Sequence, residues 1–395
     1  MSRGIQVIAG NRRMAAVQAP AIPLVADLIR ANPGTISLGQ GVVGYGPPPQ
    51  AVDRIRDFLA DPQNHKYQAV DGITPLLSLL QRKLDEENGV LIGPDRALVV
   101  TAGGNMAFMN AILAIVDPGD EVIITSPYYF NHEMAIAIAN ARVVTVPTDE
   151  QYQLSVDALE MAITPRTRAI VTISPNNPTG AVYPPEQLRA VNELCRSRGI
   201  YHISDEAYEY FTWNGTTHFS PGSIRESEGH TISLYSLSKS YGFASWRIGY
   251  MVVPGRLFEP IRKIQDTNLI CPPVVSQWAA VGALEAGRQY CRSRMPGIAA
   301  ARQVVLAALA DAGDVCQVPA AQGAFYVLLN VAAELDSMRV VERLVREHRV
   351  AVMPGSTFGV TDRCALRVSY GPLDPDTARE GAARLVNGLR AILTM

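Results

Sequence analysis

Lys239 is the residue whose type and surroundings most strongly suggest chemistry, and it lies in the segment Ser-Leu-Ser-Lys-Ser-Tyr-Gly at 236–242. It follows the apolar run 231–235, and its neighbours are serines rather than acids, so no adjacent carboxylate holds the amine in its charged form. A neutral lysine amine can condense with an aldehyde to form a Schiff base. A loop lysine seen alone is usually only solvated, so this interpretation depends on the residues that surround it in the fold.

Asp205 is a second candidate, because it ends an apolar run that begins at Tyr201. A buried carboxylate costs several kcal/mol unless a cation pairs with it, so this position requires a cationic partner. Taken singly, Asp205 could be a helix N-cap, and Asn177, which precedes Pro-Thr-Gly, could be a turn residue. Neither structural role excludes ligand binding.

Two further features could bind anions. Gly103, Gly104 and Asn105 lie between a β-rich run and the helical segment 106–116, so their amides are expected at a helix N-terminus, which favours a phosphate. Arg367 alternates with apolar neighbours in a strand-like segment and therefore faces the opposite side, where an exposed arginine usually meets only water.

The elements that must position these residues are seven short β-rich runs separated by helix-like stretches. They are 97–101, 121–125, 142–146, 169–173, 201–205, 231–235 and 248–253. This alternation predicts an α/β fold with a parallel sheet covered by helices on both faces. Ligands of such sheets bind beyond the carboxyl ends of the strands, and the loops after these runs carry the residues named above.

The order of elements changes after Pro273. A helix pattern continues to about Arg294, Pro296-Gly297 is expected to break it, and a helix at 298–312 is followed by strands at 324–330 and 366–370. We therefore expect residues 1–45 to form an arm and substrate loop, 46–290 a large domain, and 291–395 a small α+β domain that packs with the N-terminal segment.

Composition excludes several classes of protein. The chain has 395 residues, 48% hydrophobic and 18% charged, with 35 basic against 37 acidic residues, so neither disorder nor a nucleic-acid partner is expected. The five cysteines are scattered and show no metal-ligand spacing, so neither a disulfide framework nor a metal site is expected. The longest apolar stretch is too short to cross a bilayer and no signal-peptide pattern is present, which predicts a soluble, cytoplasmic protein without a membrane partner.

In motif order from about Ile36 to Tyr370, the chain resembles the pyridoxal-phosphate-dependent aminotransferases of fold type I, class I/II, the superfamily of aspartate, aromatic and kynurenine-type enzymes. The resemblance implies a mostly parallel seven-stranded sheet in a large domain, a smaller α+β domain, and bound pyridoxal 5'-phosphate. It also implies amino-acid and keto-acid substrates and a homodimer with shared active sites.

The resemblance also implies roles for single residues. Lys239 would hold the cofactor as a Schiff base and move the substrate proton, Asp205 would pair with the cofactor's ring nitrogen, and Tyr208 would donate to its phenolate oxygen. The cofactor-binding residues that the resemblance implies are Gly104, Asn105, Tyr129, Asn177, Asp205, Tyr208, Ser236, Ser238, Lys239 and Arg247, with Tyr67 reaching the phosphate of the neighbouring subunit. For the substrate carboxylate it implies Arg367, with Gly39 and Asn177 beside it.

Several functions remain open at this level. Pyridoxal-phosphate-dependent β-lyases and cyclases use the same residues, whereas a DNA-binding regulator has no room for its second domain, and a dead site would be expected to lose Asp205, Lys239 or Arg367. The preferred amino donor is expected to have an uncharged aromatic or aliphatic side chain. The family's dicarboxylate-specific members need a second cation for the distal carboxylate, and one class takes it from an arginine in the segment that aligns with 265–273. This segment has no Arg or Lys here. Val42, Val43 and Tyr45 also give the entrance loop an apolar lining.

Overall fold

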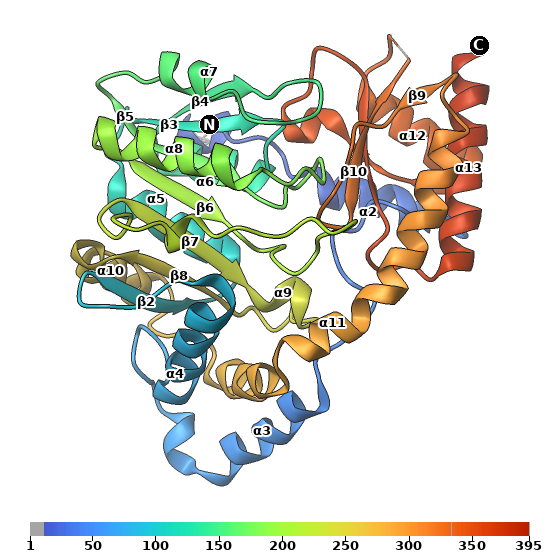
Figure 1. The fold of residues 1–395 in the computed structure, drawn as a ribbon. Coiled ribbons are helices and arrows are strands. Elements are labelled where there is room, and N and C mark those ends of the chain that lie inside the picture. Colours follow the sequence, from blue (N-terminus) through green and yellow to red (C-terminus); the bar gives the residue numbers. More distant parts are fainter. Residues whose placement is uncertain (1–11, 333, 395) are drawn as a thin grey trace, which may run out of the picture.

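The computed structural model describes residues 12–332 and 334–394, and its centre is a seven-stranded sheet with the order β2-β8-β7-β6-β5-β3-β4 (Figure 1). Its strands are β2 (Arg96–Thr101), β3 (Glu121–Ser126), β4 (Arg142–Pro147), β5 (Thr167–Ile173), β6 (Tyr201–Asp205), β7 (Thr231–Ser236) and β8 (Gly249–Pro254). Strands β3 to β7 run parallel, while β8 is antiparallel to both neighbours. The prediction of a mostly parallel sheet from seven runs is confirmed.

Helices cover both faces of this sheet. On one face the apolar core contains side chains of α5 (Gly104–Ile115), α6 (Phe130–Ile138) and α10 (Phe258–Asn268). On the other face it contains side chains of α8 (Pro185–Arg198), α4 (Thr74–Lys83) and the first part of α11 (Val274–Ala310). The remaining helices and helical turns of this region are α3 (Pro49–Ala60), α7 (Val156–Met161), α9 (Leu237–Ser240), η1 (Pro62–His65), η2 (Leu84–Asn88), η3 (Pro221–Ser223) and η4 (Gly255–Leu257).

A smaller antiparallel sheet, of order β12-β13-β10-β9, occupies the C-terminal part. Its strands are β9 (Cys316–Gln317), β10 (Tyr326–Val331), β12 (Met353–Pro354) and β13 (Ala365–Ser369), accompanied by α12 (Ser337–His348), η5 (Gly355–Phe358) and α13 (Pro375–Leu393). The second part of α11 and α13 pack side by side at the edge of the molecule (Figure 1). The two strands predicted at 324–330 and 366–370 overlap β10 and β13.

The N-terminal segment packs on this C-terminal part. Strand β1 (Ile36–Ser37) pairs in parallel with β11 (Val350–Ala351), and Val25 of α2 (Ala21–Ala31) belongs to the same apolar core as β10 and β13. The expectation of an arm and loop missed the helices α1 (Arg12–Ala16) and α2, and its residues 1–11 lie outside the described residues. The prolines were misleading, because Pro23 lies in the first turn of α2, where a helix needs no N–H donor.

Helix α11 links the two sheets and contains a kink at Gly287, whose φ of 66° and ψ of −177° are not helical. The predicted break at Pro296-Gly297 is wrong, because the helix continues through both residues to Ala310. Proline removes one backbone hydrogen bond, whereas glycine without a Cβ can adopt the positive φ that interrupts the helix. The break therefore lies nine residues before the predicted one.

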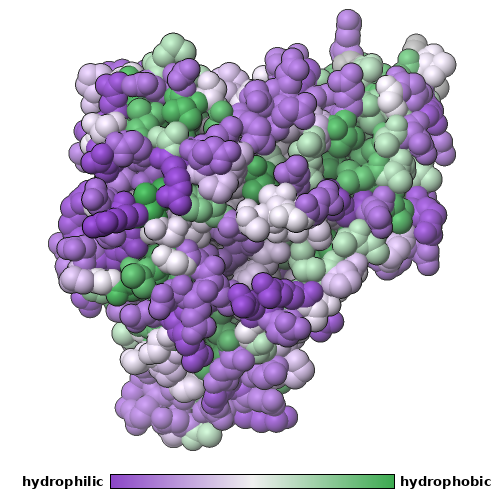
Figure 2. All heavy atoms as spheres, viewed as in Figure 1, coloured by the Kyte–Doolittle hydropathy of each residue, from purple (hydrophilic) through white to green (hydrophobic). Residues whose placement is uncertain are grey.

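Hydrophilic side chains cover most of the face seen in Figure 2, with hydrophobic groups in separate patches between them. Among the described helices, we find none that combines the length and the apolar composition needed to cross a membrane.

Candidate active site

Three adjacent parallel strands bring the motifs together. Asn177 follows β5, Asp205 ends β6, and Ser236 ends β7 just before Lys239 in α9. Their carboxyl ends open into a cavity of about 110 Å³. The cavity is lined by Gly104, Asn105, Tyr129, Ile173, Asn177, Asp205, Ala207, Tyr208, Ser236, Ser238, Lys239 and Arg247. All ten cofactor residues expected within one chain are therefore placed around a single cavity.

One end of this cavity has the hydrogen-bond donors needed to bind an anion. The N-terminus of α5 lies beside the Arg247 guanidinium, and a Cβ on Gly103, whose φ is 82°, would lie only 2.1 Å from Arg247 Nη2. Arg247 also donates to Ser238 Oγ at 3.4 Å, and Ser236 Oγ accepts the Ser238 N–H at 3.1 Å. Helix N–H groups, two hydroxyls and a guanidinium are the donors that a phosphate requires.

The opposite end of the cavity holds the Asp205 carboxylate. Its Oδ2 lies 3.1 Å from His132 Nε2, and its Oδ1 accepts the Ala207 N–H at 3.1 Å. The His132 ring is buried and stacks on Phe108, with centroids 3.8 Å apart and planes at 15°. Sequence analysis missed His132, although a histidine in the first turn of the helix after the Tyr129 loop was a usable signal.

Tyr208 and Asn177 lie between these two ends. Asn177 Nδ2 donates to the Tyr208 hydroxyl at 3.4 Å, and this hydroxyl also shares a hydrogen bond with that of Tyr326 at 3.0 Å. Burial, and then the nearby Tyr326 and Tyr129, raise the pKa of Tyr208 well above its usual value, so its phenol stays protonated and can donate. Tyr326 was missed because it belongs to β10 of the smaller sheet, and no motif marks it.

The Lys239 amine faces both the cavity and the entrance loop, where Nζ donates to the Gly41 carbonyl oxygen at 2.6 Å. Burial, and then the positive charges of Arg367 and Arg247, lower the pKa of Lys239 to about 8 against the opposing charge of Asp205. At pH 7 about a tenth of such amines are neutral. The amine is thus prepared to act as a nucleophile and as a base.

Arg367 enters the site from β13, on the face opposite to its apolar neighbours. It is only 3% exposed, and its guanidinium donates from Nη1 to Asn177 Oδ1 and from Nη2 to the Gly39 carbonyl, both at 2.8 Å. Its Nε is buried without a hydrogen-bond partner among the described residues. A buried guanidinium with an unused donor can bind a carboxylate ligand.

A second cavity, of about 420 Å³, adjoins the first and shares Tyr129, Asn177, Tyr208 and Lys239 with it. The other residues that line it are Ile22, Val25, Ala26, Ile29, Ser37, Gly39, Gln40, Gly41, Val42, Phe130, Tyr326, Met353 and Arg367. Its walls are therefore mostly apolar, and helix α2 supplies one of them. Sequence analysis missed this wall because it interpreted 1–45 as an arm and loop.

Tyr67 is not brought to either cavity of its own chain. It lies between η1 and α4 and is 79% exposed. Within one chain, Tyr67 is thus the one predicted cofactor residue that the structure places away from the site.

This arrangement can be compared with known proteins. The model of the family "Aminotransferase class I and II" matches residues 33–385. The chain belongs to this family. The aminotransferase is 32% identical over 393 residues to the aromatic aminotransferase ISS1 of Arabidopsis thaliana, covering 97% of each chain. It is 35% identical over 376 residues to the aspartate/prephenate aminotransferase of Thermus thermophilus, covering 94% of each chain.

The fold agrees with solved structures of this family. The aspartate aminotransferase of Thermus thermophilus with maleate superposes with a TM-score of 0.89 at 32% identity, covering 97% of this chain and 100% of that one. The aminotransferase therefore has fold type I and is a transaminase that acts on amino and keto acids with pyridoxal 5'-phosphate as its cofactor. These relatives do not favour the alternative of a β-lyase or cyclase.

The residues present fit this cofactor. The cavity combines an anion cradle at α5 and Arg247, a carboxylate at Asp205 for a protonated ring nitrogen, and an amine at Lys239 for an aldehyde. The Gly103 position leaves no room for a side chain beside Arg247, which keeps the cradle open for the phosphate.

Proposed function

We propose that this aminotransferase prefers amino donors with uncharged aromatic or aliphatic side chains. The observation that carries this proposal is the charge of the 420 Å³ cavity, whose lining among the described residues contains only two cations, Lys239 and Arg367. The chemistry at Cα needs the first, and the α-carboxylate needs the second. A distal carboxylate would have no cation left among the described residues that line this cavity.

The walls of the cavity support the same conclusion. Ile22, Val25 and Ile29 of α2 line this cavity together with Met353 and Val42. Each methylene buried there contributes about 0.8 kcal/mol, so larger apolar donors are favoured by several-fold per carbon. The relatives include both an aromatic and an aspartate/prephenate aminotransferase, so their names do not decide the donor. The proposal therefore rests on the residues that line the 420 Å³ cavity.

The roles of the site residues follow from their positions. When bound, pyridoxal 5'-phosphate supplies an electron sink for the electrons of the substrate's Cα–H bond. Arg367 binds and orients the α-carboxylate, so that Cα–H lies over Lys239, which removes the proton and returns it elsewhere as a general acid. Asp205 would hold a proton on the ring nitrogen of the bound cofactor, and Tyr208 and Asn177 would donate to its phenolate oxygen.

We also propose a homodimer in which Tyr67 donates to the phosphate bound by the partner subunit. Its 79% exposure supports this role, because so exposed a phenol is available to a second copy. Sedimentation should give a dimer, and Tyr67→Phe should weaken cofactor binding without changing the assembly. A monomeric enzyme with full cofactor affinity would refute this part of the proposal.

The domain boundaries remain part of the proposal as well. One apolar core consists mainly of residues from 298 to 392 and includes Val25 and Leu38 of the N-terminal segment. Phe130, Tyr208, Phe211 and Trp213 of the large domain also belong to it. This core supports a small domain at 291–395 that packs with the segment 1–45, beside a large domain at 46–290. Limited proteolysis should release fragments that end near these boundaries, and cleavage spread evenly along the chain would contradict them.

The donor preference is tested by kcat/KM for aspartate, glutamate, methionine, phenylalanine and tyrosine with a common keto acid. We expect phenylalanine, tyrosine or methionine to exceed aspartate. A tenfold or greater preference for aspartate would show that the side-chain pocket has been misinterpreted, while the cofactor chemistry would be unaffected.

A sharper version of this test uses helix α2. Ile22 lines the cavity and is 51% exposed, so Ile22→Arg adds a cation without burying it fully. We expect it to raise kcat/KM for aspartate relative to phenylalanine. Leu24→Arg is the matched control, because Leu24 has the same exposure on the same helix but does not line the cavity.

A further inference from the structure

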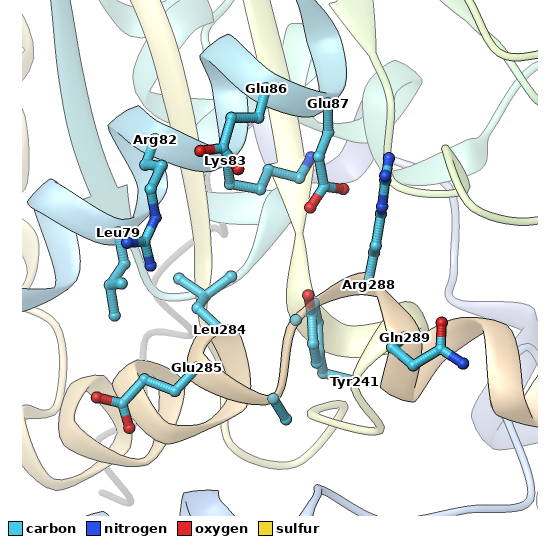
Figure 3. A pocket seen from close by; sticks show the side chains of 12 residues that line it. Leu79, Arg82, Lys83, Glu86, Glu87, Tyr241, Leu284, Glu285, Arg288 and Gln289 are labelled. Atoms are coloured by element: carbon cyan, nitrogen blue, oxygen red, sulfur yellow. The ribbon is translucent and has the colours of Figure 1, made fainter.

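A third cavity, of about 440 Å³, lies between α4, η2 and the kink of α11 (Figure 3). It shares no lining residue with the two cavities of the active site. Its volume falls in the range of small-molecule sites. The residues that line it are Leu79, Arg82, Lys83, Glu86, Glu87, Tyr241, Leu284, Glu285, Ala286, Gly287, Arg288 and Gln289.

The kink at Gly287 shapes this cavity. Leu284 is buried against the large-domain core, whereas Gly287, with its φ of 66°, interrupts the helix before Arg288. The side chain of Arg288 then extends alongside that of Glu87 from η2 (Figure 3). A continuous helix would place these side chains differently, so the kink creates the opening.

The ionic groups of the lining fall into two sets. Lys83 is paired with Glu209 at 2.6 Å, and Glu285 accepts a hydrogen bond from Arg54 Nε at 2.9 Å, so these groups are already used. Arg82, Glu86 and Arg288 form no hydrogen bond or ion pair with any residue in the described part of the chain.

Glu87 is also available to a ligand. Its Oε2 accepts a hydrogen bond from the Tyr210 hydroxyl, but its Oε1 has no hydrogen bond among the described residues. The available groups are therefore two guanidinium groups and two carboxylates, with no net charge. A ligand with only one sign of charge would meet as much repulsion as attraction here, whereas a ligand with both signs can pair at each end.

The Tyr241 hydroxyl is the observation that most directly indicates a ligand. Tyr241 is only 2% exposed, and its hydroxyl, near Tyr210 and Cys291, makes no hydrogen bond of normal geometry with either or with any other described residue. It points toward Glu87 and Lys83 across the cavity (Figure 3). Burial raises the pKa of Tyr241, so the group is a neutral phenol that can donate or accept. A buried polar group left without a partner is costly, and a polar ligand would satisfy it.

We propose that this cavity is a second binding site, specific for a small zwitterion of the α-amino-acid class. Its carboxylate pairs with Arg288, its ammonium group with Glu87, and one of its polar groups with the Tyr241 hydroxyl. The site is separate from the catalytic one, and it does not rest on the proposed donor preference.

The position of the site gives it a direct connection to catalysis. Tyr241 follows Lys239 by two residues, and its N–H donates to the Leu237 carbonyl at 3.2 Å, which ends the helix α9 that carries Lys239. Its ring lies parallel to that of Tyr290, with centroids 6.4 Å apart, just beyond the kink. A ligand at Tyr241 therefore contacts the segment that positions the catalytic lysine.

The proposal is tested by calorimetric titration of the holoenzyme with 2-aminoisobutyrate, a zwitterion that lacks a Cα–H and cannot be transaminated. We expect a binding event that persists in Arg367→Ala, where the catalytic carboxylate site is lost. Arg288→Gln should raise the Kd of this event about tenfold, since it removes one charge-assisted hydrogen bond. Tyr241→Phe should raise it several-fold.

Arg292→Gln is the matched control, because Arg292 is exposed on the same helix and does not line the cavity, so its Kd should equal that of the wild type. Isobutyrate and isopropylamine, which each carry one of the two charges, should bind at least tenfold more weakly. The proposal is overturned if Arg367→Ala removes all binding, if Arg288→Gln binds like Arg292→Gln, or if either singly charged probe binds as tightly as the zwitterion.

Discussion

His132 contacts Asp205, the one carboxylate among the described residues that line the 110 Å³ cavity: its Nε2 lies 3.1 Å from Asp205 Oδ2, and its ring stacks on that of Phe108. This contact orients one oxygen of the Asp205 carboxylate, and the other oxygen accepts a hydrogen bond from the Ala207 N–H. The carboxylate cannot turn away from the cavity without losing the hydrogen bond to Ala207 and the contact with His132. Two predictions follow from this relationship and three from other contacts of the site.

Asp205→Asn is expected to keep the fold and the cofactor but to lose most of the activity. Loss of one member of a buried ion pair costs about 3 to 5 kcal/mol, which corresponds to roughly two to four decades in rate if it acts on the transition state. Steady-state kinetics on purified protein with full cofactor content provides the measurement. Activity above about a tenth of wild type would contradict the role of this charge.

His132→Phe is expected to lower kcat about ten- to a hundredfold, because it removes the polar contact of Nε2 with Asp205 but keeps the aromatic stack. His132→Gln can still donate a hydrogen bond and should restore part of kcat. The pH at which the visible cofactor band changes should move in the Phe variant and return toward wild type in the Gln variant. A purely structural His132 would alter stability in both variants and leave this pH unchanged.

Lys239→Ala is expected to yield a folded protein that still binds the cofactor through the α5 and Arg247 cradle. Turnover should be several orders of magnitude slower, because the group that moves the proton is missing. Absorption spectra should also lack the band of the covalently held cofactor. Transamination at the wild-type rate by the purified variant would exclude Lys239 as the catalytic lysine.

The Lys239 amine should also make the stability of the cofactor-free protein depend on pH. Burial lowers its pKa to about 8, against 10.5 in the unfolded chain, so between these values the unfolded chain binds more protons and the free energy of unfolding rises with pH. The difference between the two pKa values corresponds to about 3 kcal/mol. The free energy of unfolding of Lys239→Met should thus exceed that of the wild type, and the difference should be largest below pH 8.

Denaturant unfolding of both cofactor-free proteins at pH 7 and pH 9.5 measures this margin. We expect the advantage of Lys239→Met to shrink as the pH approaches 10.5, the pKa of the lysine in the unfolded chain. An advantage of equal size at both pH values would show that the amine is not desolvated as its surroundings suggest.

Arg367→Gln is expected to raise KM for amino-acid donors by about ten- to a hundredfold, since it removes the charge that meets the α-carboxylate. Phenethylamine, which has no carboxylate, serves as the control probe, and its Kd for the holoenzyme should change little. Equal losses for phenylalanine and phenethylamine would mean that Arg367 supports the site in another way, such as through its bond to Asn177.

Much of the site was predictable because its residues belong to local segments. Asp205, Lys239 and the Gly103-Gly104 turn each lie at the end of a β-rich run, and parallel strands place such ends at one edge of the sheet. The regular alternation of β-rich and helical segments was therefore sufficient to predict that these residues lie close together. The resemblance to a known family then indicated which ligand these ends would hold.

The rest depended on contacts between segments that are distant in the sequence. His132 against Asp205, Tyr326 against Tyr208, and the wall that α2 forms beside Lys239 carry no local signal, because packing between separate elements places them. The break in α11 also fell at Gly287 rather than at Pro296, because the helix tolerates the loss of one hydrogen bond but not a positive φ. Strand periodicity and loop chemistry thus determined the sheet and its catalytic edge, while only tertiary packing determined the pocket walls and the second cavity.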